Sequence, residues 1–454
     1  MKAAFGTAKE ADLDRTELGK LEVKVEALRK LPPGAELAGS LNTLAWEGLY
    51  YLEPAQSEAL ALEAGELAEK LGLEGERARS LLTMAVLKQD TGDFREALLL
   101  CRKAMEAYES VNDKRGMAAA HGTTGNIHWS QGVIEKALEH HLASLKIKLE
   151  TGASPDIIAH SHFNIGSCCL NLEQLERAEE AYEQVRMTWE NSGDRSRVAF
   201  LYNNMGSLYM KRGDTTAALD YLGKALALRL ELGQKKNAAS TLSAIGDLHR
   251  QTGDLRMALD CYSRSLCLYR ECENTRGTAY TLCRTAGAHI SLGSPELAAP
   301  LLEEALEISA DGELREISLL CHEEMVNLED ALGRFESALS WARKLMKLRE
   351  EFLNWESMER IERLQLQFDI ENTEREAEIH RLRNVELTRA NRELLEALEH
   401  VKRLQSMLPI CCNCKKIRDD SGYWEQIDLY ISRHSDTRFS HGICPDCYRK
   451  LYGQ

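Results

Sequence analysis

The chain has 454 residues, of which 44% are hydrophobic, only 6% are aromatic and 8 are proline. This length allows two or three domains, and the scarcity of proline and aromatic residues favours long helices over sheets. The 57 lysines and arginines against 72 acidic residues give a formal charge of −15, the wrong sign for general binding to a phosphate backbone. We therefore expect an all-α protein, and we do not expect nucleic acid as its general partner.

The first residues, MKAAFGTAKEADLD, lack the apolar core of a secretory signal, and no run of 18 or more apolar residues follows them. We therefore expect a cytoplasmic protein without a membrane partner. In that compartment the 13 cysteines should be thiols or metal ligands.

An N-terminal helix is predicted over residues 13–30, where apolar residues recur at helical spacing until LPPG ends the pattern. The stripe consists of Leu18, Leu21, Val25 and Leu28. Its expected role, within residues 1–35, is to cap the first repeat. A detachable autoinhibitory segment is the alternative, and the sequence does not separate the two.

A small residue recurs at intervals of 40 or 41 residues through most of the chain. The positions are Ala45, Ala85, Gly125, Gly166, Gly206, Gly246 and Ala286. Seven residues after each position from Ala85 onward stands a glycine that can end a helix, Glu173 being the exception, and an alanine follows five residues later. Each unit is therefore a helix, a turn and a second helix that packs closely on the first. About eight such hairpins over residues 36–352 should stack into one superhelix.

These units resemble tetratricopeptide repeats, through phrases such as GDFREALLLCRKAMEAY and GDLRMALDCYSRSLCLY. The 40-residue unit is similar to the long form in kinesin light chains, in cell-polarity adaptors with GoLoco partners and in bacterial peptide-sensing regulators. The resemblance implies a groove, lined by the first helix of each hairpin, that binds a peptide or a partner helix.

The position two residues before each small residue is the one where, by this resemblance, an asparagine amide commonly holds a bound peptide backbone. This chain has Thr43, Thr83, Thr123, Asn164, Asn204, Ala244 and Arg284 at that position. Asn164 and Asn204 are therefore the candidate peptide-binding residues. The alternative is that both are solvated helix residues.

Histidines and cysteines inside the repeats are expected to pack between helices. His128, His249 and His289 each follow the small position by three residues, where the repeat family commonly has an aromatic residue, and His141 takes the place of a tyrosine in other units. The pair Cys168–Cys169 suggests redox chemistry, but cysteine is a common small core residue. We expect all eight cysteines before residue 410 to serve helix packing.

A long helix is predicted over residues 353–408, because neither glycine nor proline occurs from Asn354 to Leu408. Its second half carries apolar residues at alternating spacings of three and four, which is coiled-coil spacing. This seam consists of Leu387, Ala390, Leu394, Ala397, Val401, Leu404 and Leu408. We expect it to pair two copies into a homodimer. A solvated helix that packs on its own chain is the alternative.

Residues 409–454 contain two C-x2-C pairs, Cys411 with Cys414 and Cys444 with Cys447. Zinc prefers four soft ligands in a tetrahedron, and each pair supplies two thiolates from one tight turn. We expect a small α+β module with one structural Zn²⁺ on these four cysteines. Whether Cys412 or His441 takes part stays open. The phrases LPIC, CKKIRDD, GYW and FSHGICPDC resemble a module at the C-terminus of many bacterial signalling proteins.

The predicted function is that of a non-catalytic scaffold or adaptor in bacterial cytoplasmic signalling. No P-loop, HExxH, GxSxG or dinucleotide fingerprint is present. The groove would bind a peptide or protein, the coiled coil would dimerise the chain, and the zinc module would be a second contact surface. The alternative is a transcriptional or nucleic-acid-binding regulator that uses the zinc module.

Overall fold

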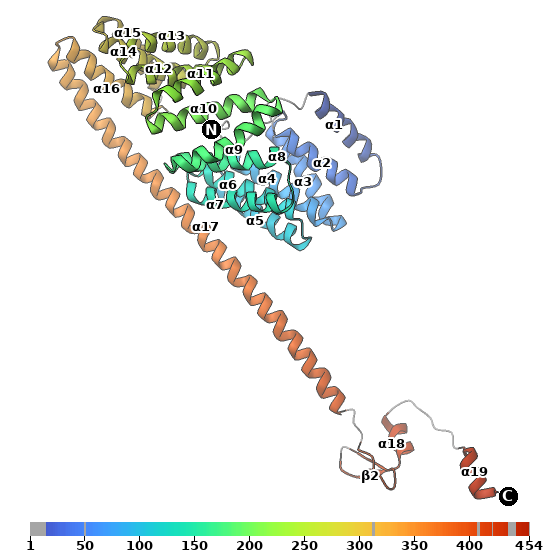
Figure 1. Ribbon diagram of the computed structural model, residues 1–454. Coiled ribbons are helices and arrows are strands. Elements are labelled where there is room, and N and C mark those ends of the chain that lie inside the picture. Colours follow the sequence, from blue (N-terminus) through green and yellow to red (C-terminus); the bar gives the residue numbers. More distant parts are fainter. Residues whose placement is uncertain are drawn as a thin grey trace. The chain divides into compact units, whose positions relative to one another are not determined.

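The computed structural model describes residues 15–49, 51–310, 314–405, 409–419, 421–434 and 442–453 (Figure 1). Its internal contacts divide the chain into two units, Met1–Leu366 and Gln367–Gln454. The described part of the first unit is built from helices alone. The second unit holds the rest of the last long helix, a two-stranded hairpin and two short helices.

The helices of the first unit follow one another with short turns (Figure 1). In chain order they are α1 (Arg15–Arg29), α2 (Ala35–Gly48), α3 (Pro54–Leu71), α4 (Glu74–Asp90), α5 (Phe94–Ser110), α6 (Lys114–Ser130), α7 (Ile134–Glu150), α8 (Pro155–Asn171), α9 (Leu175–Ser192), α10 (Arg195–Arg212), α11 (Thr215–Glu231), α12 (Lys235–Gln251), α13 (Leu255–Glu271), α14 (Thr275–Ser291), the 3-10 turn η1 (Pro295–Leu297), α15 (Ala298–Ser309), α16 (Arg315–Ala331) and α17 (Phe335–Gln405).

From α2 to α15 the helices pair into antiparallel hairpins, each even-numbered helix with the next one, and Trp341 of α17 packs against the core that α16 shares with α14 and α15. The recurring small residues explain the close pairing. A Cβ added at Gly125, Gly166 or Gly246 would lie 2.7, 2.7 or 2.6 Å from a ring carbon of the partner helix, on His141, Tyr182 or Tyr262 respectively. The predicted all-α solenoid of helical hairpins is therefore confirmed.

The turn inside each hairpin from α4 onward has one recurring geometry, well shown at Gly213. This glycine has a φ of +81°, and the next residue, Asp214, donates its N–H to the Tyr209 carbonyl at 3.0 Å. The Asp214 carboxylate then accepts the Ala217 N–H at 3.0 Å and caps α11. Glu173 stands where the other units have glycine, and it adopts the same left-handed region with a φ of +58°.

Helix α1 packs on α2 through Leu18 and Val25, which are buried together with Leu37, Leu41 and Leu44. An apolar stripe on α1 therefore covers the apolar face of the hairpin formed by α2 and α3, as predicted.

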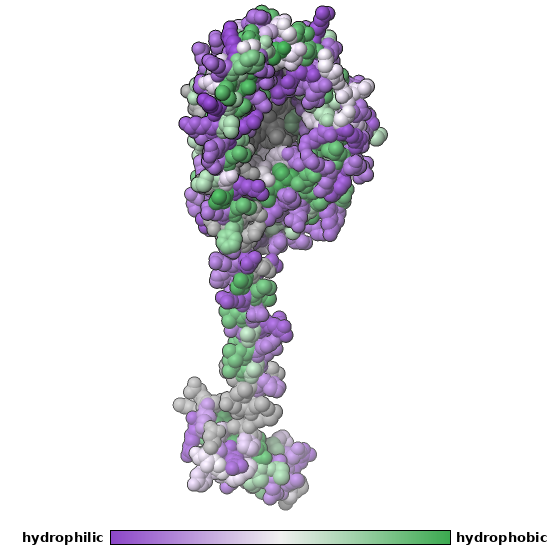
Figure 2. Space-filling view, turned by 90° about the vertical axis from the view of Figure 1, so that its left-hand side faces the viewer, coloured by the Kyte–Doolittle hydropathy of each residue, from purple (hydrophilic) through white to green (hydrophobic). Residues whose placement is uncertain are grey.

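The first helices of successive hairpins contact one another directly: α2 with α4, α4 with α6, α8 with α10, α12 with α14 and α14 with α16. No comparable contact joins successive second helices in the described residues. Elements that approach each other most closely lie on the inner side of a curved stack, so the first helices form the inner face. Figure 2 shows a hollow in the surface of the repeat region.

Helix α17 continues without a break from the last hairpin through Gln405, because Gly333 is the last glycine before that point. Its first turns complete the eighth hairpin. Beyond them it exposes large apolar side chains, including Leu387 and Leu394, which are 60% and 59% exposed.

None of the helices in the described parts of the chain is both long enough and apolar enough to span a membrane.

The C-terminal segment forms a small α+β arrangement. Strands β1 (Ile417–Arg418) and β2 (Trp424–Glu425) pair antiparallel, with Ile417 opposite Glu425. Helices α18 (Ile427–His434) and α19 (Pro445–Tyr452) follow. Its buried side chains among the described residues are those of Ile417 and Tyr430.

Candidate functional site

Asn164 is held on α8, in the inner row of helices, and its side chain is only 5% exposed. Its Oδ1 atom is fully buried and accepts no hydrogen bond. The same is true of Oδ1 of Asn126 on α6, the preceding inner helix. A buried amide oxygen without a donor is costly in a finished fold, so both side chains retain unused capacity for hydrogen bonds.

Asn204 on α10 differs from Asn164, although it holds the equivalent place in its repeat. It is half-buried, and its Nδ2 donates to the Phe200 carbonyl one turn back at 2.9 Å. Part of its hydrogen-bonding capacity is therefore used by its own helix. Of the two predicted residues, Asn164 is the one with a buried, unused oxygen.

An aromatic cluster lies beside these amides. The Phe163 ring is 5.2 Å from the Trp189 ring and 5.2 Å from the Phe200 ring, measured between centroids. Phe163 and Trp189 are buried, whereas Phe200 on α10 remains partly accessible. Phe163 adjoins Asn164 in the sequence and Phe200 lies one turn before Asn204 on α10, so a partly accessible ring accompanies the amides on these helices.

A charged network joins the inner helices α12 and α14. The Asp247 carboxylate accepts hydrogen bonds from the hydroxyls of Tyr262 and Tyr280, each at 2.7 Å. Arg284 donates through Nε to the Tyr280 hydroxyl at 3.0 Å, and the same Nε lies 3.4 Å from Asp247 Oδ1. Arg250, also on α12, has a buried Nε with no hydrogen-bond partner.

The sequence predicted only some of these inner-helix residues. Arg284 stands at the same repeat position as Asn164, two residues before the small residue, but only the asparagines were predicted to bind a peptide. Asn126 and Asp247 were missed, although each directly follows the small residue of its repeat, Gly125 or Gly246. That shared position was the signal that pointed to both.

Several histidines pack where α6, α7 and α8 meet. The Nδ1 atoms of His121 and His140 are 3.0 Å apart, and the rings of His128 and His140 stack with centroids 5.5 Å apart. Burial lowers the pKa of His128, His140 and His160 to about 4 and that of His141 to about 3. The site is a neutral packing cluster, as expected for His128 and His141.

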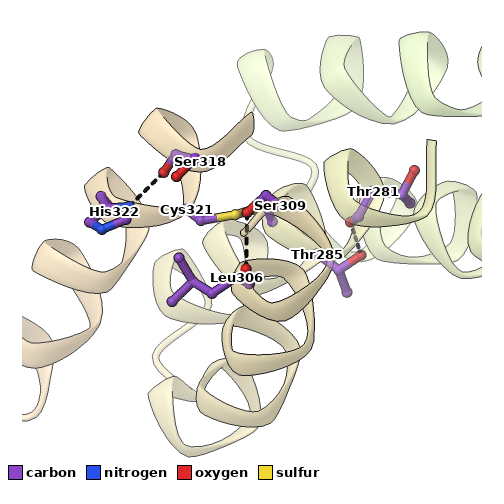
Figure 3. The surroundings of a disulfide bond; sticks show 8 residues. Thr281, Thr285, Leu306, Ser309, Ser318, Cys321 and His322 are labelled. Atoms are coloured by element: carbon purple, nitrogen blue, oxygen red, sulfur yellow. Dashed lines mark hydrogen bonds between the residues drawn. A yellow bond between two sulfur atoms is a disulfide. The ribbon is translucent and has the colours of Figure 1, made fainter. Parts of the chain in front are cut away.

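Two of the cysteines predicted to serve only packing are instead bonded to each other. Cys283 on α14 and Cys321 on α16 are both fully buried and form a disulfide across 38 residues of sequence (Figure 3). The prediction failed here because the two residues fall at different places in their repeats and meet only when α14 and α16 pack together. Cys168 and Cys169 are free and buried, as predicted for packing residues.

The first C-x2-C pair lies in a turn, and the second spans the start of α19, where Cys444 is the N-cap residue and Cys447 lies in the first turn. Backbone N–H groups of Cys414 and Asn413 lower the pKa of Cys411, and those of Cys447 and Asp446 lower the pKa of Cys444. Such donors favour thiolates, the form that binds zinc, so the chemistry of each turn fits that ion. The described residues nevertheless contain no group of three or more histidine, cysteine or acidic side chains placed to hold a metal ion. His441 lies outside the described residues, and Cys412 is exposed.

The repeated hairpins with their inner row of first helices define an α-solenoid. The model of the tetratricopeptide repeat matches residues 76–150, 156–231, 197–271 and 237–311, which together make up just over half of the chain. The chain therefore belongs to the tetratricopeptide repeat family. No curated protein sequence matches it.

Three solved structures share the fold at low sequence identity. The apo quorum sensor NprR of B. thuringiensis is 14% identical, with a TM-score of 0.54 over 74% of this chain and 94% of that one. The Rap protein complexed with competence and sporulation factor is 15% identical, with a TM-score of 0.52 over 75% and 94%. Aspartyl phosphate phosphatase F of Bacillus subtilis is 13% identical, with a TM-score of 0.51 over 74% and 90%.

Proposed function

We propose that this chain is a non-catalytic adaptor of bacterial cytoplasmic signalling whose inner face binds a peptide or a partner helix. The observation that carries the proposal is that Asn126 and Asn164, on the inner helices α6 and α8, each have an amide oxygen without a hydrogen-bond partner in the chain; both oxygens are buried, so a peptide would reach them only after the amides turn. An extended peptide presents backbone N–H and C=O groups, and an asparagine amide can both accept from the former and donate to the latter.

The surroundings of Asn164 also support the proposal that the inner face binds a peptide. The partly accessible Phe200 ring offers apolar contact next to the amides, a combination that suits a peptide side chain beside its own backbone. Two proteins with the same fold carry related descriptions: the Rap protein is complexed with competence and sporulation factor, and NprR is a quorum sensor. At 13–15% identity all three likenesses concern the fold, so neither these two descriptions nor that of the phosphatase decides the function of this chain.

The test is retention of a synthetic pool of short peptides, randomised in sequence, on the purified full-length protein. Wild type should retain part of the pool. Asn164→Ala and Asn126→Ala should each weaken the retained peptides about tenfold, as expected for the loss of one or two hydrogen bonds. The matched control is Asn191→Ala on the second helix α9, whose Nδ2 donates to the Met187 carbonyl at 2.7 Å. An equal loss in the control, or no retention by wild type, contradicts the proposal.

The adaptor is further proposed to form a homodimer through α17. The support is the exposed seam, in which Leu387 and Leu394 lie one heptad apart and Ala390 between them is also exposed. Val401, Leu404 and Leu408 of the predicted seam lie outside the described side chains.

A structural Zn²⁺ on Cys411, Cys414, Cys444 and Cys447 is part of the same proposal, and it would make the C-terminal segment a second contact surface. The ion would supply no chemistry beyond holding the two turns together, because four thiolates leave no open position for a substrate. Elemental analysis of the full-length protein should find one zinc per chain. Cys444→Ser should lose it and the adjacent-cysteine control Cys412→Ser should keep it; a metal-free wild type contradicts this part.

A further inference from the structure

Arg229, on the second helix α11, is a buried cation at a position where most other repeats have a buried aromatic residue. The residue is only 5% exposed. At steps of 40 or 41 residues the same position holds Tyr108, Lys148, Trp189 and Tyr269. The three aromatic residues are buried, whereas Lys148 is only partly buried. A guanidinium in this place loses most of its hydration, so its charge needs a partner inside the fold.

The hydrogen-bond partners of Arg229 are all neutral groups. Its Nη1 atom donates to Oδ1 of Asn203 on α10 at 2.9 Å, to the carbonyl of Asn237 on α12 at 3.0 Å, and to the hydroxyl of Thr241 on α12. These oxygens replace water around one nitrogen, but none of them carries a negative charge. The positive charge of Arg229 is therefore hydrogen-bonded without being neutralised.

Two acidic residues at the ends of α11 and α13 are already paired with other cations. Glu231 on α11 forms a salt bridge with Arg195, and Glu271 on α13 forms one with Lys235 at 2.8 Å. Among the ion pairs of the described residues, none includes Arg229. No described acid of the chain therefore balances this guanidinium.

The pKa values agree with the absence of a carboxylate beside Arg229. Burial lowers the pKa of Arg229 to about 10, and the charge that opposes this shift belongs to the Tyr269 phenol. Burial also raises the pKa of Tyr269, so this phenol is uncharged at neutral pH. Arg229 still keeps its proton at that pH. Within the described residues, the buried charge thus has no negative counterpart.

The other edge of the guanidinium is available to a ligand. In the part of the chain that the structure describes, Nε and Nη2 of Arg229 have no hydrogen-bond partner, and neither atom is completely buried. Their N–H groups lie in one plane and point to the same side. Because so little of the residue is exposed, this edge suits a small ion better than a charged group on a bulky ligand.

We propose that Arg229 binds a small monovalent anion, of the size of chloride, at the joint between α10, α11 and α12. One unbalanced positive charge calls for one negative charge, and a halide can accept from Nε and Nη2 together. Since Nη1 already contacts α10 and α12, the bound anion would stabilise the packing of one hairpin on the next. The site stands on a second helix and does not depend on peptide binding at the inner face.

The experiment follows the unfolding of the purified full-length protein in urea while chloride replaces gluconate at constant ionic strength. An anion that binds only the folded chain raises the folding constant by up to about tenfold for each tenfold rise in its concentration. The urea midpoint of wild type should therefore rise between about 10 and about 100 mM chloride. Bromide should have the same effect as chloride.

Variants locate the ion. Arg229→Gln removes the charge but can still donate to the neighbouring oxygens, and it should abolish the rise with chloride. Arg229→Met should do the same. The matched control Arg256→Gln, at an exposed position on the second helix α13, should keep the wild-type rise. Chlorine NMR reads binding independently of stability: wild type should broaden the chloride line more than Arg229→Gln does, and as much as Arg256→Gln does.

A wild-type midpoint that does not respond to chloride overturns the proposal. An equal response in Arg229→Gln also overturns it, because the ion would then lie elsewhere. If Arg229→Met loses its helical circular dichroism, Arg229→Gln decides alone.

Discussion

Gly122 and Gly125 lie one turn apart on α6 and are predicted to respond in opposite ways to the same substitution. A Cβ at Gly125 would lie 2.7 Å from Cε1 of His141, whereas a Cβ at Gly122 would meet only Ser144 Oγ, at 3.6 Å. Gly125→Ala should therefore lower the free energy of unfolding by about 1–3 kcal/mol, and Gly122→Ala should raise it by up to about 1 kcal/mol. Chemical denaturation of both variants checks this; two changes of the same sign contradict the packing described here.

At the scale of single residues, periodicity predicted the packing positions but not the polar pairings. Gly125 and Gly246 were found from spacing alone, because seven of the eight hairpins have a small residue at the same place. The hydrogen bonds from Tyr262 and Tyr280 to Asp247 were not predictable, since they join three helices and depend on side-chain directions that no repeat unit encodes.

At the scale of elements, the histidine cluster between α6, α7 and α8 predicts sensitivity to acid. The pKa values of His128, His140 and His160 fall to about 4 in the folded chain, below the ordinary 6.5. Between these values the unfolded chain binds protons that the folded chain excludes, so stability is lost as the pH falls from 6.5 towards 4. Each such histidine contributes up to about 1.4 kcal/mol per pH unit.

The measurement is the thermal unfolding midpoint across that pH range. His141→Tyr should flatten the loss, because Tyr182 and Tyr262 fill the same place against Gly166 and Gly246 in other repeats. The control His400→Gln, at an exposed position on α17, should follow wild type. A midpoint that stays constant in wild type from pH 6.5 to 4 would contradict this prediction. It would mean that the histidines bind protons as readily in the folded chain as in the unfolded chain.

The hairpins were predictable as elements. That the second helix of the last hairpin and the connecting helix form one continuous helix, α17, was not predicted. A glycine or its equivalent, Glu173, ends the first helix of every unit from α4 onward, so these turns could be found by their spacing. The sequence places the repeats up to residue 352 and the connecting helix from 353, and α17 runs through that point, from Phe335 to Gln405, because nothing in that stretch breaks a helix. The Cys283–Cys321 bond likewise depends on contact between α14 and α16, which lies beyond a single unit.

At the scale of the whole molecule, the seam of α17 predicts dimerisation. Leu394→Lys places a charge in the seam, whereas Leu395→Lys places the same charge on a neighbouring residue outside it, and the two leucines are similarly exposed, at 59% and 64%. Sedimentation equilibrium of the full-length protein should show a dimer for wild type and for Leu395→Lys, and a monomer for Leu394→Lys. A monomeric wild type would contradict the homodimer.

Peptide binding on the inner face is the central claim, and photo-crosslinking tests it most directly. A retained peptide that carries a benzoylphenylalanine would be irradiated on the full-length protein, and the labelled residues would be mapped by mass spectrometry. Labels should fall on the first helices α6, α8 and α10, near Asn126, Asn164 and Phe200. Labels confined to the second helices, to α17 or to residues 409–454 would contradict it.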